Sequence, residues 1–399
     1  MNIAVAPTRN TARDWQEPKV TLPAWAYCSD EFLQLEREHL LLASPQIVGH
    51  INDMPNPGDY LTLDFLGERA LVVRGDDGDV RAFHNVCRHR AAAVVRGQKG
   101  SCPNGLRCLY HGWHYALDGQ LKAVPADATF PGLDKREYRL KPLDVEIWMG
   151  FIFVKFRSGG SSIAERMRPY ETELRAYRLD EMVPDTRSWD VDTGSDWKNV
   201  MDNYLEGYHV AVGHPGLYRL FGTRYDTEVQ PNGVCKAIQW LRDKPSPVWS
   251  ERAYQSILPE IGHLPADRRR AWAYYTLLPN ASFDIYPEFM DFFQVVPTTA
   301  GRSRVRGRCY RLPELDGRAH QAARWLNYRI STEVQREDND LTRSVQAGLA
   351  SGAYSTGILS EKEECVAALH DLVRRALPIA RLPEKPAPGT MAEINAGMM

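Results

Sequence analysis

Two short loops, each with one cysteine and one histidine, constrain this chain more than any other feature. One residue separates Cys87 from His89, and two residues separate Cys108 from His111. Two thiolates and two neutral imidazoles suit a [2Fe-2S] cluster in which the cysteines hold one iron and the histidines the other. The same ligands also suit a tetrahedral zinc ion, but zinc motifs usually group cysteine with cysteine and histidine with histidine. The mixed pairs therefore favour the iron–sulfur cluster.

Length and composition set the broad class of the protein. A chain of 399 residues exceeds the usual size of one hydrophobic core, so we expect two domains. The net charge of −2 gives no reason to expect a nucleic acid or a membrane as a partner. No run approaches the roughly 20 apolar residues that a membrane span needs, and the charged residues among the first 18 argue against a signal peptide. Seven scattered cysteines fit reduced thiols, so we predict a cytoplasmic protein.

The first half of the chain has the pattern of a small β domain. Short apolar runs are separated by turn residues, which is typical of antiparallel strands. These predicted strands are Tyr60–Leu63, Ala70–Val73, Val80–Phe83 and a closing strand at 147–154. Because they flank the two cysteine–histidine loops, we place an all-β domain at 45–156 and a boundary in the serine- and glycine-rich run at 158–162. Residues 1–44, with a helical run from Asp30 to Leu42, are expected to pack on the second domain.

The second domain, at 163–399, is predicted to mix an antiparallel meander with helices. The predicted strands are Trp272–Leu278, Ser282–Tyr286, Phe289–Val296 and Arg304–Leu312. A long helix is expected from Ala319 to Leu349, because apolar residues recur there at helical spacing. This apolar row consists of Leu326, Ile330, Val334, Leu341, Val345 and Leu349.

A second metal site is suggested by two histidines. A helix predicted from Trp197 to Tyr208 leads into His209 and carries Glu206 on the same face. His214 lies five residues after His209, which in a regular helix turns it about 140° away. Either the helix ends near Gly213, or a π-bulge brings the two histidines together. The alternative is that one histidine caps a helix end and the other lies in the core.

A third ligand is suggested by the long helix. Four residues beyond Val334 in the apolar row lies Asp338, and a carboxylate on a buried face is costly unless it is paired or binds a metal. Two imidazoles and one carboxylate form the facial triad of Fe(II) oxygenases. A salt bridge from Asp338 to an arginine such as Arg336 or Arg343 is the alternative. Two rival carboxylates, Glu337 and Asp340, lie further from the apolar row by helical phase.

Four segments resemble one known family. Asn85–Arg90 and Cys108–Trp113 resemble the cluster loops of Rieske proteins, Asn203–His209 resembles the iron-site motif of Rieske non-heme iron oxygenases, and Arg336–Asn339 resembles the segment with the carboxylate ligand. The chain is thus similar to the oxygenase component of this family, the ring-hydroxylating α subunit. The resemblance implies an α+β fold, with an all-β Rieske domain and a START-like helix-grip catalytic domain containing a curved antiparallel sheet.

The resemblance also implies roles for particular residues. Cys87, His89, Cys108 and His111 would hold the [2Fe-2S] cluster, and His209, His214 and Asp338 would hold a mononuclear Fe(II). In this family electrons cross between the subunits of a homotrimer, so His111 of one subunit would meet Glu206 of the next, and Glu206 would touch His209. Two features depart from the family pattern: a glutamate at 206, where many relatives have aspartate, and a slightly long segment at 90–107.

The resemblance implies O2 as a co-substrate and a separate partner that supplies electrons. The chain has no GxGxxG fingerprint after a predicted strand. We therefore expect NAD(P)H to act only through a separate flavin or iron–sulfur reductase, or through a ferredoxin.

The substrate class is less constrained. The segments 283–287, 325–330 and 345–349 resemble the α-only branch of the family, which contains betaine and quaternary-ammonium demethylases. Aromatic residues of the meander are candidates for a cation cage, although half of them should point away from any pocket. They are Trp272, Tyr274, Tyr275, Phe283, Tyr286, Phe289, Phe292 and Phe293. The sequence thus favours monooxygenation of a small organic substrate with N-demethylation of a betaine-type amine. Aromatic ring hydroxylation or dihydroxylation is the alternative, and an electron-transfer Rieske protein without oxygenase activity is a third possibility.

Overall fold

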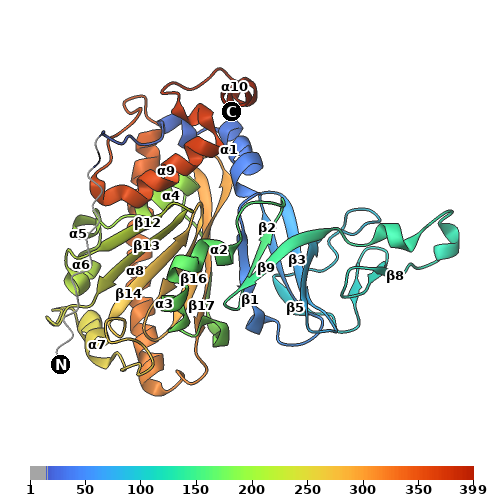
Figure 1. The fold of residues 1–399 in the computed structure, drawn as a ribbon, viewed down its shortest axis with the longest axis horizontal. Helices are drawn as coiled ribbons and strands as arrows, with labels where there is room; N and C mark the ends of the chain where they lie inside the picture. The colour runs from blue at the N-terminus through green and yellow to red at the C-terminus, as the bar shows by residue number, and fades with distance from the viewer. Residues whose placement is uncertain (1–14, 16) are drawn as a thin grey trace. The chain divides into compact units, whose positions relative to one another are not determined.

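The chain folds into two compact units (Figure 1). The computed structural model describes residue 15 and residues 17–399. The first unit contains the N-terminal residues up to Leu40 together with 187–309 and 314–399, and the second contains 41–186 and 310–313. The domain limits inferred from the sequence stay a prediction, and the second unit differs from the predicted 45–156 by including 41–44, 157–186 and 310–313. Most of the N-terminal run in which no signal peptide is predicted lies outside the described residues.

The second unit is built on antiparallel strands. A seven-stranded sheet has the order β1-β10-β9-β4-β3-β2-β5, and a small sheet has the order β6-β7-β8. The large sheet consists of β1 (Gln46–His50), β2 (Asp59–Phe65), β3 (Glu68–Arg74), β4 (Val80–His84), β5 (Lys99–Ser101), β9 (Pro142–Trp148) and β10 (Phe151–Lys155); the small one consists of β6 (Leu106–Arg107), β7 (His114–Tyr115) and β8 (Leu121–Ala123). Helices α2 (Ile163–Met167) and α3 (Glu171–Arg175) follow β10.

The single closing strand predicted at 147–154 is wrong, because the segment is a hairpin. Trp148 at the end of β9 pairs with Phe151 at the start of β10, so the turn has two residues. These residues, Met149 and Gly150, both have positive φ, of 44° and 81°, as a type I′ turn requires. Methionine followed by glycine is not the usual asparagine–glycine or aspartate–glycine signal, so the apolar run reads as one strand in the sequence.

Substitution of Gly150 provides a test of this turn. Gly67 occupies the same position in the β2–β3 hairpin, with a φ of 84°. A Cβ atom at Gly67 meets no described atom within 4 Å, whereas one at Gly150 overlaps the imidazole of the buried His50. Both glycine-to-alanine changes should cost about 1 kcal/mol from the left-handed backbone, and Gly150→Ala should cost about 1–3 kcal/mol more from overpacking. Thermal unfolding followed by circular dichroism should therefore show a much larger loss for Gly150→Ala, and equal losses would contradict the packing argument.

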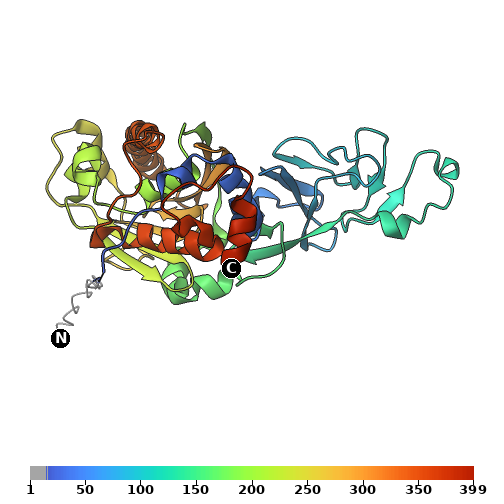
Figure 2. The same ribbon diagram turned by 90° about the horizontal axis from the view of Figure 1, so that it is seen from above.

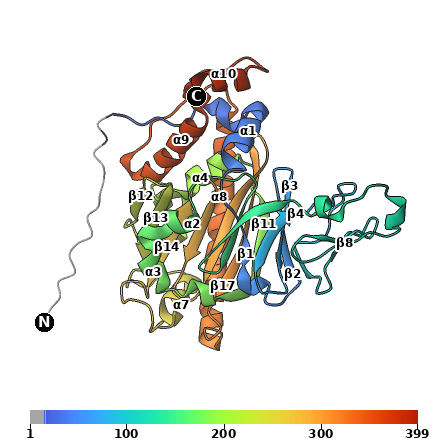
Figure 3. The same cartoon turned by 45° about the vertical axis from the view of Figure 1, so that its right-hand side comes forward.

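Most of a seven-stranded antiparallel sheet lies in the first unit; its last six strands along the chain form a meander, and the first strand lies beside the last (Figure 3). Its order is β11-β17-β16-β15-β14-β13-β12. The strands are β11 (Val183–Asp192), β12 (Asp226–Gln230), β13 (Val234–Trp240), β14 (Ala271–Leu277), β15 (Ala281–Ile285), β16 (Met290–Thr299) and β17 (Arg302–Arg311). The helices of this unit are α1 (Asp30–Glu36), α4 (Trp197–Tyr204), α5 (Val210–Gly213), α6 (Pro215–Phe221), α7 (Trp249–Ile257), α8 (Arg318–Leu349), α9 (Glu364–Ala376) and α10 (Met391–Met398). No helix in the described part of the chain is long and apolar enough to cross a bilayer.

The long helix α8, seen almost end-on in Figure 2, buries only the first half of its predicted apolar row. Leu326 and Ile330 belong to the core between α8 and the sheet. In contrast, Leu341 is 36% exposed and Val345 is 50% exposed in this chain. The prediction of a continuous buried row is therefore wrong beyond Val334, because the core that covers the helix ends there.

Helix α4 is fixed to the N-terminal segment by buried polar contacts. The ammonium group of Lys198 is fully buried and lies 2.8 Å from carboxylate oxygens of Glu36 and Asp196. At the next turn, Asp202 accepts a hydrogen bond from the Tyr27 hydroxyl at 2.7 Å and lies 2.9 Å from His370 Nε2. Removing one partner from such a buried set leaves an uncompensated charge. These contacts hold α4, and the functional segment after it, in one position.

Candidate metal centres

The two cysteine–histidine loops of the second unit have the same backbone geometry. In the first, the amide of Cys87 donates to the carbonyl of Ala92 at 2.7 Å, and the amide of Ala91 donates back to Cys87 at 3.0 Å. In the second, the amide of Cys108 donates to the carbonyl of Trp113 at 2.9 Å, and the amide of Gly112 donates to the carbonyl of Cys108 at 3.0 Å. The fourth residue after each cysteine has positive φ, of 60° at Ala91 and 73° at Gly112. Two matching loops thus present one cysteine and one histidine each.

The structure brings these four side chains together. Cys87 and Cys108 are both buried, and their side chains are within hydrogen-bond contact of each other. The rings of His89 and His111 lie 4.6 Å apart between centroids, at an interplanar angle of 68°. The Tyr115 hydroxyl lies 3.3 Å from the Cys87 sulfur and completes the surroundings of that thiol.

The polar atoms of these loops fit a bound metal group. Nδ1 of His89 is buried and has no hydrogen-bond partner among the described residues. Burial raises the pKa of the Cys87 thiol, and the neighbouring Cys108 adds to this effect while Tyr115 opposes it. A metal would replace the thiol protons and satisfy the imidazole nitrogen, since thiolate and neutral imidazole are its ligands.

The segment with the two candidate histidines departs from the predicted helix. The prediction of one helix from Trp197 to Tyr208 is wrong, because α4 ends at Tyr204. The Glu206 carboxylate accepts backbone N–H groups from Tyr208 and His209, which favours a turn over continued helix. His209 then precedes the short helix α5, which ends at Gly213. The break between the histidines is thus a helix end rather than a π-bulge.

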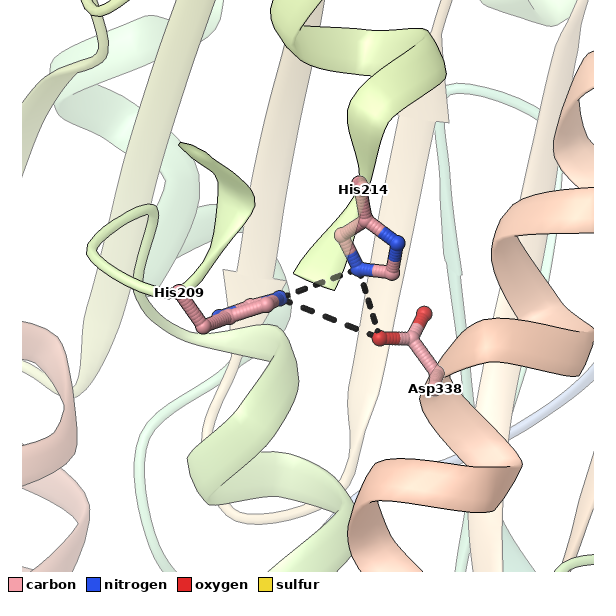
Figure 4. A group of neighbouring side chains, drawn as sticks. All are labelled: His209, His214 and Asp338. Carbon is pink, nitrogen blue, oxygen red and sulfur yellow. Dashed lines mark hydrogen bonds and ion pairs between the residues drawn. The ribbon is translucent and has the colours of Figure 1, made fainter. Parts of the chain in front are cut away.

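His214 lies between two helices, and this position turns it toward His209. It follows α5, and Pro215 begins α6 directly after it, a position where the missing proline N–H costs nothing. Figure 4 shows the two imidazoles converging on the carboxylate of Asp338, which projects from α8. His214 Nε2 lies 3.1 Å from His209 Nε2 and 2.9 Å from Asp338 Oδ1, and His209 Nε2 lies 3.8 Å from the same oxygen.

Each imidazole is oriented by a second carboxylate. Nδ1 of His209 contacts Glu206, and Nδ1 of His214 lies 2.7 Å from Glu337 Oε2. Because a carboxylate accepts hydrogen bonds, each Nδ1 carries the proton and each Nε2 presents a lone pair to the centre. Two imidazole lone pairs and a carboxylate oxygen therefore face one another. This set of acceptors fits a metal cation, and the three ligand atoms lie within 4.8 Å of one another.

The structure separates Asp338 from the alternatives that the sequence leaves open. Arg336 pairs with Glu333 and Asp340 on the surface, and Arg343 donates to the carbonyl of Thr193. Asp338 instead accepts a hydrogen bond from Asn203 at 2.6 Å. The role of Glu337 as the partner of His214 is missed by the sequence reasoning, which treats it only as a rival ligand. Its position next to Asp338 is the one signal that points to it.

The group formed by His209, His214 and Asp338 lies on the wall of a cavity of about 440 Å³ in the first unit. Five of the eight aromatic residues proposed as cage candidates line this cavity: Trp272, Tyr274, Tyr286, Phe289 and Phe293. The other three, Tyr275, Phe283 and Phe292, are paired across neighbouring strands on the opposite face of the sheet. Strand alternation therefore divides the aromatic residues as expected.

Comparisons with known proteins agree with this architecture. The family model "Ring hydroxylating alpha subunit (catalytic domain)" matches residues 179–379, and the model "Rieske [2Fe-2S] domain" matches 44–139. The crystal structure of a quaternary ammonium Rieske monooxygenase superposes with a TM-score of 0.78 at 23% identity, covering 94% of this chain and 99% of that chain. This likeness confirms the predicted α+β fold with its curved antiparallel sheet.

Curated relatives include oxygenases named for carnitine and for choline. The carnitine monooxygenase oxygenase subunit of Acinetobacter pittii is 31% identical over 198 residues, which span 49% of this chain and 53% of the relative. The chloroplastic choline monooxygenase of Spinacia oleracea is 28% identical over 350 residues, which span 84% and 73%. The chain thus matches about half the length of the carnitine relative. Together with the two family models, the paired loops and the group formed by His209, His214 and Asp338, these matches show that the chain belongs to the ring-hydroxylating α-subunit family of Rieske oxygenases.

Proposed function

We propose that this protein is a terminal oxygenase that monooxygenates an N-methyl group of a small betaine-type amine. The observation that carries the proposal is the convergence of His209, His214 and Asp338 on the wall of an aromatic-lined cavity. Two imidazoles and one carboxylate leave positions open on an iron, and the aromatic faces suit a quaternary ammonium group. The names of the relatives, which act on carnitine and choline, support the same substrate class.

Two metal groups have separate residues in this proposal. Cys87, His89, Cys108 and His111 would hold the [2Fe-2S] cluster, while His209, His214 and Asp338 would hold a mononuclear Fe(II). When bound, the cluster supplies electrons and the mononuclear iron activates O2. A separate reductase or ferredoxin delivers electrons that originate from NAD(P)H. A homotrimer and a cytoplasmic location remain part of the proposal.

The chain's own residues bind, orient and protect in this reaction. Glu206 and Glu337 fix the tautomers of the two histidines, so that both Nε2 atoms face the cavity. Asn203 holds the carboxylate of Asp338. The apolar and aromatic walls exclude water from the reacting N-methyl group, which limits side reactions of the oxidant. Loss of formaldehyde from the hydroxymethyl product would complete the N-demethylation.

Hydroxylation or dihydroxylation of an aromatic ring is the second candidate function. It is favoured by apolar residues that share the cavity wall with the metal group, namely Val200, Leu217 and Val305. A flat ring would fit such a wall without any charge on the substrate. An electron-transfer protein without oxygenase activity would need neither this cavity nor the second set of ligands.

The proposal is tested by turnover with a compatible reductase, NADH and O2. L-carnitine, choline and glycine betaine are the candidate amines, and benzoate and naphthalene are the aromatic comparison. We expect O2 uptake with at least one amine and formaldehyde released in equal amount. Uptake coupled only to an aromatic compound would establish the second function, and no coupled uptake in protein with three irons per chain would overturn both.

A further inference from the structure

Two buried carboxylates face each other across neighbouring strands of the cavity wall. Asp284 on β15 pairs directly with Asp291 on β16 in the register of the sheet. Both line the cavity, and they are only 8% and 7% exposed. Directly opposed residues on one sheet face have Cβ atoms about 5 Å apart, and like charges at such positions are destabilising. The pair therefore needs a compensating interaction.

The protein itself compensates only one member of the pair. Asp284 accepts a hydrogen bond from the Tyr204 hydroxyl at 2.6 Å and another from Ser282. In the part of the chain that the structure describes, no group donates a hydrogen bond to the carboxylate of Asp291 and no cation pairs with it within 4.0 Å. The positive charge of Arg187 lowers the pKa of Asp291 without direct contact. The Arg187 guanidinium instead lies over the Tyr328 ring and donates a hydrogen bond to the Thr332 hydroxyl at 2.7 Å. The Asp291 carboxylate therefore depends on the contents of the cavity for its polar contacts.

The charge of the pair depends on its surroundings. Burial raises the pKa of Asp284 to about 7, although Tyr204 and Ser282 oppose this shift. Burial also raises the pKa of Asp291 well above its usual value; Asp284 adds to this shift, and Arg187 opposes it. The titratable groups that face the pair from other elements are Tyr204 of α4, Tyr225 before β12, Tyr274 of β14, Tyr286 after β15 and Arg187 of β11. Two such carboxyl groups titrate as one unit, and a proton shared between them relieves their repulsion.

Aromatic side chains lie on both sides of the pair. On one side, the ring of Tyr286 stands edge-on to Trp272 at 4.8 Å and stacks on Phe289 at 4.5 Å. On the other side, Tyr204 stands edge-on to Phe293 at 4.3 Å. All of these residues line the same cavity. A cation between the two groups would meet π faces as well as carboxylate oxygens.

We propose that Asp284 and Asp291 together form the site that recognises the ammonium nitrogen of the substrate. This inference rests on the proposed function and adds the residues that select a charged nitrogen over an uncharged group of the same shape. The bound cation takes the place of the shared proton, which leaves to solvent, so the charge inside the cavity stays nearly constant. The cost of keeping two buried carboxylates is then offset by the ligand. Asp284 and Asp291 are thus specificity-determining residues.

The test compares choline with 3,3-dimethylbutan-1-ol, in which carbon replaces the charged nitrogen. Calorimetric titration of wild-type protein should give at least about tenfold tighter binding of choline. In Asp291→Asn and in Asp284→Asn, which keep side-chain size, this preference should fall to about twofold or less, while binding of the alcohol stays within about twofold of wild type. Asp190→Asn is the matched control, because Asp190 pairs with Arg304 on the surface of the same sheet. It should keep the full preference for choline.

A second measurement tests whether choline binding releases the proton shared by Asp284 and Asp291. Titrations of wild-type protein with choline at pH 7, in buffers that differ in ionisation enthalpy, should show release of a substantial fraction of a proton. The alcohol should release none. If both variants keep the preference for choline, or if choline binds without releasing a proton, this inference is overturned even when the enzyme demethylates amines. If wild-type protein oxidises only aromatic compounds, the proposed function fails instead.

Discussion

Replacing Asp338 with alanine is expected to remove the mononuclear iron and reduce turnover at least about a thousandfold, while the cluster remains. Asp338 supplies the single carboxylate oxygen that faces both Nε2 atoms of the histidines. Without it, two neutral imidazoles cannot hold Fe(II) firmly or balance its charge. The measured iron content should fall from about three to about two atoms per chain, and the visible spectrum of the cluster should be unchanged.

Asp340→Ala is the matched control for this change. Asp340 lies two residues further along α8, where its carboxylate pairs with Arg336 at the surface. This variant should keep the third iron and full turnover. Retention of the third iron in Asp338→Ala would contradict the assignment and make Glu337, which already contacts His214, the ligand to examine next.

Changing Glu206 to glutamine is expected to slow oxidation of the reduced cluster in a single turnover by about 10- to 100-fold. The carboxylate of Glu206 accepts hydrogen bonds from the Nδ1 of His209 and from two backbone N–H groups. Glutamine keeps the size but replaces one acceptor oxygen by a donor and removes the charge that steadies a protonated imidazole. Both metal groups should stay bound, so the defect should appear in rapid-mixing measurements of cluster absorbance rather than in iron content.

Glu337→Gln provides the comparison for this second change. It alters the partner of His214 in the same way and lies on the other side of the metal group. If electrons enter through Glu206 and His209, Glu337→Gln should slow cluster oxidation much less than Glu206→Gln. Equal effects would mean that the carboxylates only orient their histidines. Unchanged transfer in Glu206→Gln would show that this carboxylate is not needed.

Local patterns were sufficient to predict much of the fold. Predicted strands such as Tyr60–Leu63 lie inside the observed β2, and the helix predicted from Ala319 begins at Arg318 and ends at Leu349 as expected. These elements have strong periodicity or clear turn signals. The hairpin at Met149 and Gly150 lacks such a signal. The exposed end of α8 could not be predicted, since it depends on where the neighbouring core stops.

The proposed metal ligands could be selected from the sequence, but their surroundings could not. Histidine spacing and a misplaced carboxylate point to His209, His214 and Asp338, and the structure brings these three together. The helix end after Tyr204 and the contact of Glu337 with His214 depend on local competition for hydrogen bonds and on tertiary packing. Likewise, the opposition of Asp284 and Asp291 exists only through the register of β15 and β16. No separation along the chain reveals it.

In the first unit, helices and sheet supply different parts of the candidate site, and this has a consequence for how such a protein can change in evolution. The proposed metal ligands come from α8 and from the turns around α5, whereas alternate positions of β14 to β16 supply much of the cavity wall. A substitution on an inward-facing strand position leaves the backbone hydrogen bonds of the sheet in place and does not move α8. New substrate preferences can therefore arise by single replacements on the strands, while the oxidative chemistry is inherited unchanged.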